Sequence, residues 1–289
     1  MELTIIHSKD LPWETGGRSL EIQPDAWRDN LGGTQEEIDS LFQHRRFRTF
    51  FADPQTGRRT TLSELTGGYE DLTNAYHDCV EETLVLSGAL SLTGHPGDLT
   101  SGHYFWRPPG YVHKAIVTGF YRGLNFLEAE RPDDDSGPVT RVIRPDEEVG
   151  MNPLHDDPET AVGPRGFVQN LNSHLLPWIP GTSFARSEDV LDGEDLEHIE
   201  VKVLSKNWVV GAQTLMVRVK PGYEQKRPSV AYRSEQQIFV LEGELSINGE
   251  LCGAESYVRR LADARSGPMS SPSGAVFIQK SDGWLGFVD

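Results

Sequence analysis

The stretch NAYHDCVEETLVLSGALSLTG, residues 74–94, decides the fold. It opens with several polar residues and continues as an apolar run that ends in Ser-Gly. His77 and Glu81 are four residues apart, a spacing that suits one face of a helix. Thr83 and Val85 are β-branched and favour a strand instead. The stretch therefore predicts a polar turn that leads into a short buried strand.

The composition favours a globular protein built from short strands. The chain has 289 residues, of which 37% are hydrophobic and 25% are charged. These values are typical of folded soluble domains, and the length suits two of them. The 29 glycines and 18 prolines indicate many tight turns rather than long helices.

The charge balance excludes several classes of partner. The formal net charge is −17, so the surface repels phosphate backbones and anionic lipids, and we expect neither nucleic acid nor a membrane as a partner. No apolar window is long enough to span a bilayer. The first residues lack the pattern of a secretory signal, which predicts a cytoplasmic location. Two cysteines, Cys79 and Cys252, exclude a disulfide framework but not a single bridge.

A weak internal repeat divides the chain into two halves. Residues 67–92 align with residues 221–247 at an offset of about 154, with small insertions between them. We therefore predict an N-terminal barrel at 1–130, a linker rich in proline, glycine and acids at 131–170, and a C-terminal barrel at 171–289.

Local signals support short strands and one helix. Short β-branched and aromatic runs recur between turn residues in both halves, which is typical of a sandwich or barrel. Asn248-Gly249 predicts a two-residue hairpin turn. Thr34 and Glu37 form a capping-box pattern before an apolar stripe that includes Leu41, so a packing helix is expected there.

A second motif follows the first along the chain. Gly102 precedes Pro108-Pro109-Gly110 by five residues, and His113 follows that turn after two more. Together with His77, Glu81 and Gly88, this spacing resembles the two motifs of the cupin superfamily, and the repeat extends the resemblance to a two-domain cupin, or bicupin. The resemblance implies an all-β fold of two tandem jelly-roll barrels with a few short helices.

The resemblance also implies a metal site in the first barrel. Its ligands would be His77, Glu81 and His113, and the family's first histidine is replaced here by Ala75. Asp78 and His103 are alternative fourth ligands, but neither fits the motif spacing. In the second half, Tyr232 or Arg233 stands for the histidine and Gln236 or Gln237 for the glutamate, so that barrel is expected to lack a metal.

The proposed ligand set suits a catalytic divalent metal. Two histidines and one carboxylate form the facial triad of non-haem iron enzymes, which makes Fe(II) the first choice, with Zn(II), Mn(II) or Ni(II) as alternatives. Three protein ligands leave positions open for water, substrate or dioxygen.

Candidate catalytic residues near the predicted metal are Tyr76, Glu82, Arg107 and Tyr111, although core packing is the commoner role of such aromatics. The first choice of function is a non-haem iron dioxygenase or other oxygenase acting on a small organic molecule. A redox-neutral lyase, isomerase or epimerase and a non-catalytic ligand-binding or sensing bicupin stay open. The resemblance also implies a homodimer.

Overall fold

Two compact units make up the chain. The computed structural model describes residues 3–15, 34–53, 58–77, 79–95, 97–128, 140–143, 168–184, 196–225 and 230–288. One unit is Pro12–His174, and the other combines Met1–Leu11 with Leu175–Asp289. The structure thus assigns the first residues of the chain to the second unit, whereas the sequence placed them in an N-terminal barrel at 1–130; the division after His174 lies close to the predicted start of the C-terminal barrel at 171. Most of the predicted linker at 131–170 lies outside the described residues.

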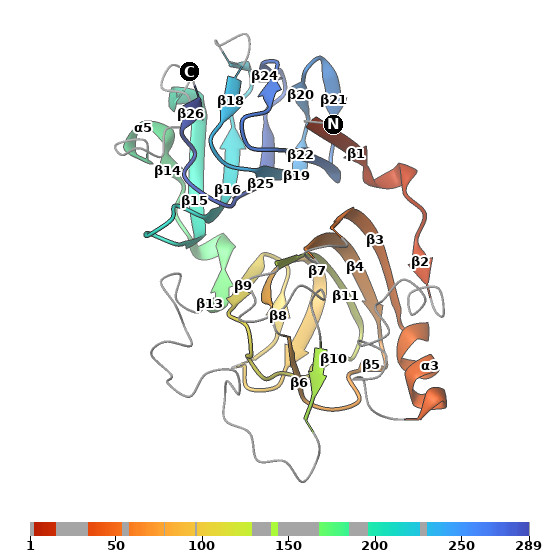
Figure 1. The fold of residues 1–289 in the computed structure, drawn as a ribbon. Helices are drawn as coiled ribbons and strands as arrows, with labels where there is room; N and C mark the ends of the chain where they lie inside the picture. Colours follow the sequence, from red (N-terminus) through yellow and green to blue (C-terminus); the bar gives the residue numbers. More distant parts are fainter. Residues whose placement is uncertain are drawn as a thin grey trace. The chain divides into compact units, whose positions relative to one another are not determined.

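The first unit is a curved antiparallel sheet (Figure 1). Its strand order is β13 (Val168–Asn172), β9 (His103–Arg107), β7 (Val80–Leu92), β11 (Phe120–Glu128), β4 (Arg59–Thr66), β3 (Arg45–Ala52) and β2 (Glu14–Thr15). β10 (Ala115–Val117) pairs with β7 and with β5 (Tyr69–Glu70), and β8 (Leu99–Thr100) also pairs with β7. β6 (Ala75–His77) pairs with β12 (Thr140–Val142).

The second unit repeats this arrangement with its own sheet. Its strand order is β1 (Leu3–His7), β22 (Ser256–Arg260), β19 (Gln236–Gly243), β25 (Ala275–Ser281), β16 (Gln213–Val219), β15 (Ile199–Lys206) and β14 (Ile179–Pro180). A smaller sheet joins β17 (Tyr223–Glu224), β24 (Met269–Ser271), β20 (Leu245–Ile247) and β21 (Glu250–Cys252). A third joins β23 (Arg265–Ser266), β18 (Val230–Tyr232) and β26 (Phe287–Val288).

The helices are short, as expected from the composition. α3 (Gln35–Gln43) has the predicted capping box, in which the Thr34 side chain accepts from the Glu37 backbone and the Glu37 carboxylate accepts from Thr34. α5 (Gly181–Phe184) and the 3-10 turns Ser8–Asp10, Ser173–Leu175 and Leu196–His198 complete the helical part of the described chain. No described helix is long and apolar enough to cross a membrane.

Each unit has its own apolar core. In the first, Phe42 from α3 packs with Leu65, Val85, Leu92 and Phe105 from the strands. In the second, side chains from β15, β16, β19, β22 and β25 form a continuous buried cluster. Cys79 and Cys252 are both buried and are not joined by a disulfide, as is typical of small core residues.

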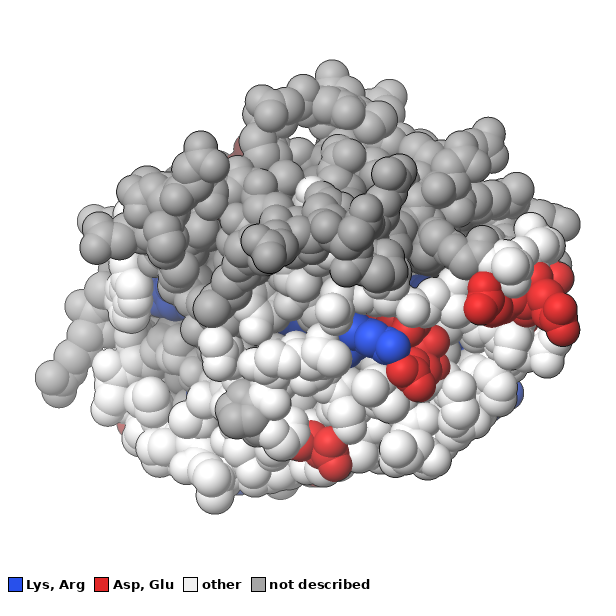
Figure 2. Space-filling view, turned by 90° about the horizontal axis from the view of Figure 1, so that it is seen from below, with Lys and Arg blue, Asp and Glu red and all other residues white. Residues whose placement is uncertain are grey.

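Acidic residues do not gather into one site on the face shown in Figure 2. On that face, the described Asp and Glu side chains stand in separate groups, one of them beside a basic side chain.

The hairpin prediction at Asn248-Gly249 is confirmed. Asn248 has φ 55° and Gly249 has φ 80°, the conformation of a type I′ turn, and the flanking strands β20 and β21 pair directly. The prediction that the strand at 83–88 ends at Gly88 is wrong, since β7 continues to Leu92.

Gly88 instead marks an irregularity inside the strand. Its φ is 76°, and a Cβ there would lie 1.9 Å from the Phe120 carbonyl oxygen of the neighbouring strand β11. Gly243 of β19 repeats the feature with φ 74° and a predicted Cβ distance of 2.1 Å to the Gly274 carbonyl oxygen. In both units a glycine lets two strands approach at a point where an L side chain does not fit.

Gly88→Ala is expected to cost at least about 3 kcal/mol of unfolding free energy, because it adds a backbone clash to the left-handed strain. Gly97→Ala is the matched control: Gly97 has φ 81°, but apart from its chain neighbours no described residue has an atom within 4 Å of its Cβ position. That variant should lose only about 1 kcal/mol. Denaturant unfolding measures both, and equal losses would contradict the close approach of β7 and β11.

Candidate metal centre

Three separate segments bring the predicted ligands together. His77 ends β6, Glu81 lies near the start of β7, and His113 follows the Pro108-Pro109-Gly110 turn. Ala75 and His113 form two backbone hydrogen bonds, each with an N to O distance of 2.8 Å. The Gly110 amide donates to the His77 carbonyl at 2.7 Å, and φ 85° at Gly110 permits this tight turn.

The ligand atoms of His77, Glu81 and His113 all lie within 4.8 Å of one another. His113 Nε2 is 3.6 Å from Glu81 Oε2, and the two imidazole centroids are 5.2 Å apart. These distances suit one ion held between the three side chains. Among the described residues, His77, Glu81 and His113 form the one group of His, Cys, Asp or Glu side chains close enough together to hold a metal ion.

The second nitrogen of His113 sets its tautomer. Nδ1 is 3.0 Å from the Tyr111 carbonyl oxygen, which accepts only, so Nδ1 carries the proton. The lone pair is then on Nε2, which is the nitrogen nearest Glu81. Metal-binding histidines are commonly oriented in this way.

A buried cation holds Glu81 in its ionised form. Arg107 Nη1 donates to Glu81 Oε2 at 2.9 Å, and Arg107 is 1% exposed. Burial raises the pKa of Glu81, but Arg107 and the two histidines outweigh it and lower that pKa to about 2. The carboxylate is therefore charged at neutral pH and available to bind a metal.

The two histidines are neutral at neutral pH. Burial lowers the pKa of His113 to about 3, with a further contribution from Arg107. Burial also lowers the pKa of His77. Since metals bind the neutral imidazole, the site needs no deprotonation to accept an ion.

The three residues thus fit a divalent metal. They supply one protein ligand fewer than the family pattern does. Ala75 lies directly opposite His113 and lines the same cavity, where its methyl group offers no ligand atom. His103 lies on β9 and is not part of the cluster. Asp78 lies outside the described residues.

The cluster opens on a cavity of about 480 Å³ inside the first barrel. Alternate residues of the strands β3, β4 and β11 form much of its wall: Arg45, Phe47 and Thr49; Arg59, Thr61, Ser63 and Leu65; Tyr121, Asn125 and Leu127. The volume suits a small organic molecule.

A polar network occupies one side of the cavity. Thr83 Oγ1 donates to Asn125 Oδ1 at 2.9 Å, and Asn125 Nδ2 donates to Ser63 Oγ at 3.0 Å. Tyr121 Oη also approaches Asn125 Oδ1 at 3.3 Å. These contacts fix the orientation of the Asn125 amide, and Ser63, Thr83 and Tyr121 line the cavity beside it.

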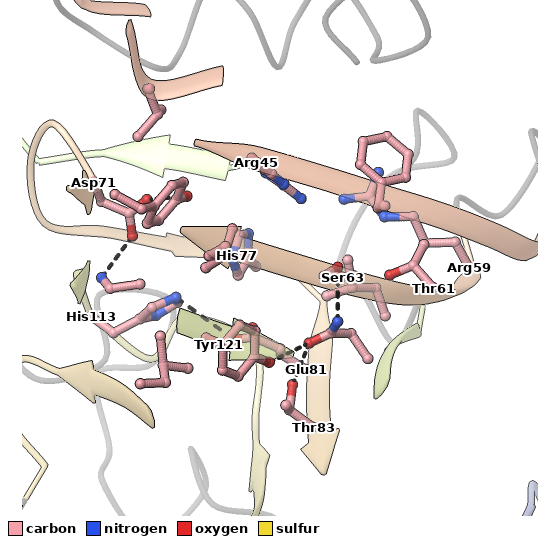
Figure 3. Close-up of a pocket in the computed structure, with 18 of the residues that line it drawn as sticks. Arg45, Arg59, Thr61, Ser63, Asp71, His77, Glu81, Thr83, His113 and Tyr121 are labelled. Carbon is pink, nitrogen blue, oxygen red and sulfur yellow. Dashed lines mark hydrogen bonds and ion pairs between the residues drawn. The ribbon is translucent and has the colours of Figure 1, made fainter. Parts of the chain in front are cut away.

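Two arginines share the wall with the ligands, as Figure 3 shows. Burial and the charge of Arg45 together lower the pKa of Arg59 to about 10, and the charge of Glu81 opposes that change. The charge of Arg59 also contributes to the low pKa of His77. Even so, Arg59 is cationic at neutral pH, so the cavity carries two positive charges close to the metal ligands.

None of the four residues predicted to be catalytic lines the described cavity: Tyr76, Glu82, Arg107 and Tyr111. Glu82 is fully buried on the opposite face of β7, where Tyr104 Oη donates to it at 2.5 Å. Tyr111 packs its ring against His95 at 6.1 Å. Tyr76 points away from His77 by strand alternation, and Arg107 reaches the site through Glu81.

Sequence reasoning missed the wall formed by β3 and β4. The available signal was period-2 alternation, which places Arg59, Thr61 and Ser63 on one face of a strand. A polar inward face of this kind resembles an exposed face in sequence. It becomes a cavity wall only when the sheet curves around it.

Strand pairing identifies the equivalent positions in the second barrel. Gln236 pairs with Arg260 as Glu81 pairs with Arg107, so Gln236 rather than Gln237 replaces the glutamate. The same offset places Tyr232 at the position of His77. Val230 pairs with Ser266 where Ala75 pairs with His113. The described chain therefore has Tyr232, Gln236 and Ser266 in place of the three ligands.

Neither a family model nor a curated protein matches the sequence. Solved structures do match over nearly the whole chain. A candidate dioxygenase from Nostoc punctiforme PCC 73102 has a TM-score of 0.73 and 15% identity, covering 99% of this chain and 85% of its own.

Two further structures share the fold. Salicylate 1,2-dioxygenase from Pseudoaminobacter salicylatoxidans, solved with gentisate adducts, has a TM-score of 0.58 and 12% identity, over 97% of this chain and 81% of its own. Protein Ylba from E. coli has a TM-score of 0.55 and 10% identity, and the match covers 97% of this chain and 90% of Ylba. These matches confirm the predicted all-β, two-barrel cupin fold.

His77→Ala and His113→Ala are each expected to weaken binding of Fe(II) or Zn(II) by more than about 100-fold, since loss of a ligand costs more than loss of its supporting contact. Isothermal titration of the apoprotein measures the affinity. His44→Ala is the control, because His44 contacts the Thr66 side chain and is not part of the cluster. Unchanged affinity in both ligand variants would contradict the site.

Proposed function

We propose that this protein is a metal-dependent cupin dioxygenase with Fe(II) held by His77, Glu81 and His113. The observation that carries the proposal is a facial set of two neutral imidazoles and one carboxylate that opens on a cavity of substrate size. Among the neighbours of the same fold, salicylate 1,2-dioxygenase acts on a small organic acid, which supports this choice.

A bound iron would supply the binding and reduction of dioxygen and a Lewis acid for the substrate. The chain's own residues prepare that chemistry. Arg107 keeps Glu81 ionised, and the Tyr111 carbonyl directs the Nε2 lone pair of His113 toward the ligand position. The position beside Ala75 leaves space for one more exogenous group than a four-ligand site would allow.

The substrate is proposed to be a small organic acid. Arg45 and Arg59 place two positive charges on the wall of the same cavity, and a carboxylate can accept two parallel hydrogen bonds from a guanidinium. The hydroxyls near Asn125 would bind further polar substituents. Apolar contacts come from Phe47, Leu65 and Phe105.

Two other functions use the same site. In a redox-neutral lyase, isomerase or epimerase, the metal would act only as a Lewis acid. In a ligand-binding or sensing bicupin, there would be no turnover. The cytoplasmic location and the homodimer stay predictions.

Oxygen uptake distinguishes these functions. The apoprotein, loaded with Fe(II) without air, should consume dioxygen only when a substrate from a panel of aromatic and aliphatic acids is added. Zn(II)-loaded protein is the control and should consume none. Turnover under nitrogen, equally fast with Zn(II), would contradict the dioxygenase and favour the redox-neutral function.

Arg59→Met should raise KM for the acid found in this panel by about 10- to 100-fold, because it removes a charged hydrogen-bond donor from the cavity. Metal content should not change. Arg218→Met is the control: the Arg218 side chain pairs with Glu200 and stacks on Trp178 in the second unit, and neither Arg218 nor these partners line the cavity. An equal rise in KM in both variants would contradict acid recognition by Arg59.

Ala75→His tests the value of the open position. The new imidazole would stand opposite His113 and supply a fourth ligand, so we expect tighter metal binding. If the open position serves dioxygen or substrate, kcat should fall while metal content rises. Higher metal affinity with unchanged kcat would show that the position left open by Ala75 is not needed for turnover.

A further inference from the structure

The second barrel conserves the buried framework around the metal centre but changes its charge. Tyr257 Oη donates to Gln237 Oε1 at 2.9 Å, as Tyr104 donates to Glu82 in the first barrel. Arg260 Nη1 donates to Gln236 Oε1 at 3.2 Å, as Arg107 donates to Glu81. The arginine is thus retained while its carboxylate partner has become an amide.

Among the described residues, Arg260 is consequently a buried cation with no carboxylate bonded to it. It is 3% exposed, and its contacts are the Gln236 amide and the Tyr232 ring, whose centroid lies 4.7 Å from the guanidinium carbon. The neighbouring Glu235 bonds instead to Arg259, through two contacts of 2.9 and 2.6 Å. A buried guanidinium is costly unless another negative charge compensates it.

A small cavity adjoins this arginine inside the second barrel. It has about 20 Å³ of free volume and is lined by Arg260, Gln236, Gln225 and Tyr232 among others, with no Asp or Glu in its described lining. This volume suits a single ion or water molecule and excludes an organic anion.

The unpaired polar atoms of these lining residues are hydrogen-bond donors. Arg260 Nε, Gln236 Nε2 and Gln225 Nε2 are buried without a partner in the described structure. The amide orientations are fixed, because Gln236 Oε1 accepts from Arg260 and Gln225 Oε1 accepts from the Met269 amide. Three donors and one positive charge therefore lie around one cavity.

We propose that this cavity binds a small monovalent inorganic anion, with chloride as the physiological candidate. An anion accepts all three hydrogen bonds and neutralises Arg260, replacing the charge that Glu81 supplies in the first barrel. A water molecule accepts two hydrogen bonds, leaves the charge in place and adds two hydrogens that need acceptors. The anion binds only the folded barrel and so stabilises it.

Thermal unfolding of the full-length protein tests the site. Sodium chloride replaces sodium gluconate at constant ionic strength, so that general screening is unchanged and gluconate is too large for the cavity. We expect a saturable rise in Tm of about 3 °C at tenfold excess over the dissociation constant. Equal Tm values in the two salts would overturn the proposal.

Three variants locate the effect. Gln236→Glu rebuilds the ion pair of the first barrel beside Arg260 and should abolish the response to chloride while the protein stays folded. Arg260→Met should also abolish it. Arg259→Gln changes a neighbouring arginine that pairs with Glu235, and should keep it. A chloride response that persists in Gln236→Glu would overturn the proposal.

Diffraction gives an independent readout that does not depend on stability. Crystals grown with bromide should show an anomalous peak next to Arg260 and Gln225, and the peak should disappear in Gln236→Glu. Density for water without anomalous signal at that position would overturn the proposal.

Discussion

The buried ion pair between Arg107 and Glu81 determines the chemistry of the first barrel. Arg107 is almost fully enclosed, so its charge needs a partner, and Glu81 is the partner across the strand pair β9–β7. The same contact keeps the carboxylate ionised beside two neutral imidazoles. In the second barrel the equivalent pair is Arg260 and Gln236. The negative charge of the carboxylate is absent there, and so is the set of metal ligands. The change from carboxylate to amide, together with Tyr232 and Ser266 at the two histidine positions, thus separates the proposed metal centre from the proposed anion site.

The second constraint is the backbone bridge between Ala75 and His113. Its two hydrogen bonds join segments 38 residues apart and place His113 beside His77. The Gly110 amide supports the same junction by donating to the His77 carbonyl. Because the bridge uses only backbone atoms, the side chain at position 75 is free to vary. Alanine there keeps the bridge but offers no ligand atom, so the proposed metal site has three protein ligands.

The ligand set could be predicted from the sequence through its resemblance to the cupin motifs, and the local turns could be predicted from their own residues. The Pro108-Pro109-Gly110 turn, the Asn248-Gly249 hairpin and the capping box at Thr34 each depend on a few neighbouring residues. The cavity wall could not be predicted in the same way. Arg45 and Arg59 reach the cavity through the curvature of a sheet, and polar residues on a strand look alike whether they face water or a substrate.

The pairing of strands that lie far apart in the chain also could not be predicted from the sequence. β1 pairs with β22, so residues 3–7 complete a sheet formed by residues about 250 positions later. Nothing in the composition of that strand specifies its partner. Likewise, the choice between Gln236 and Gln237 depended on register, since a shift of one residue exchanges the two faces of a strand. Once the pairing is known, the comparison of the two barrels follows residue by residue.

The most direct test of the three-ligand centre is a crystal structure of the protein loaded with Fe(II) without air, with data collected on both sides of the iron absorption edge. The anomalous difference should place one iron within bonding distance of His77, Glu81 and His113 Nε2, with the side beside Ala75 occupied by water. An iron bound elsewhere, or a fourth protein ligand in that position, would contradict it.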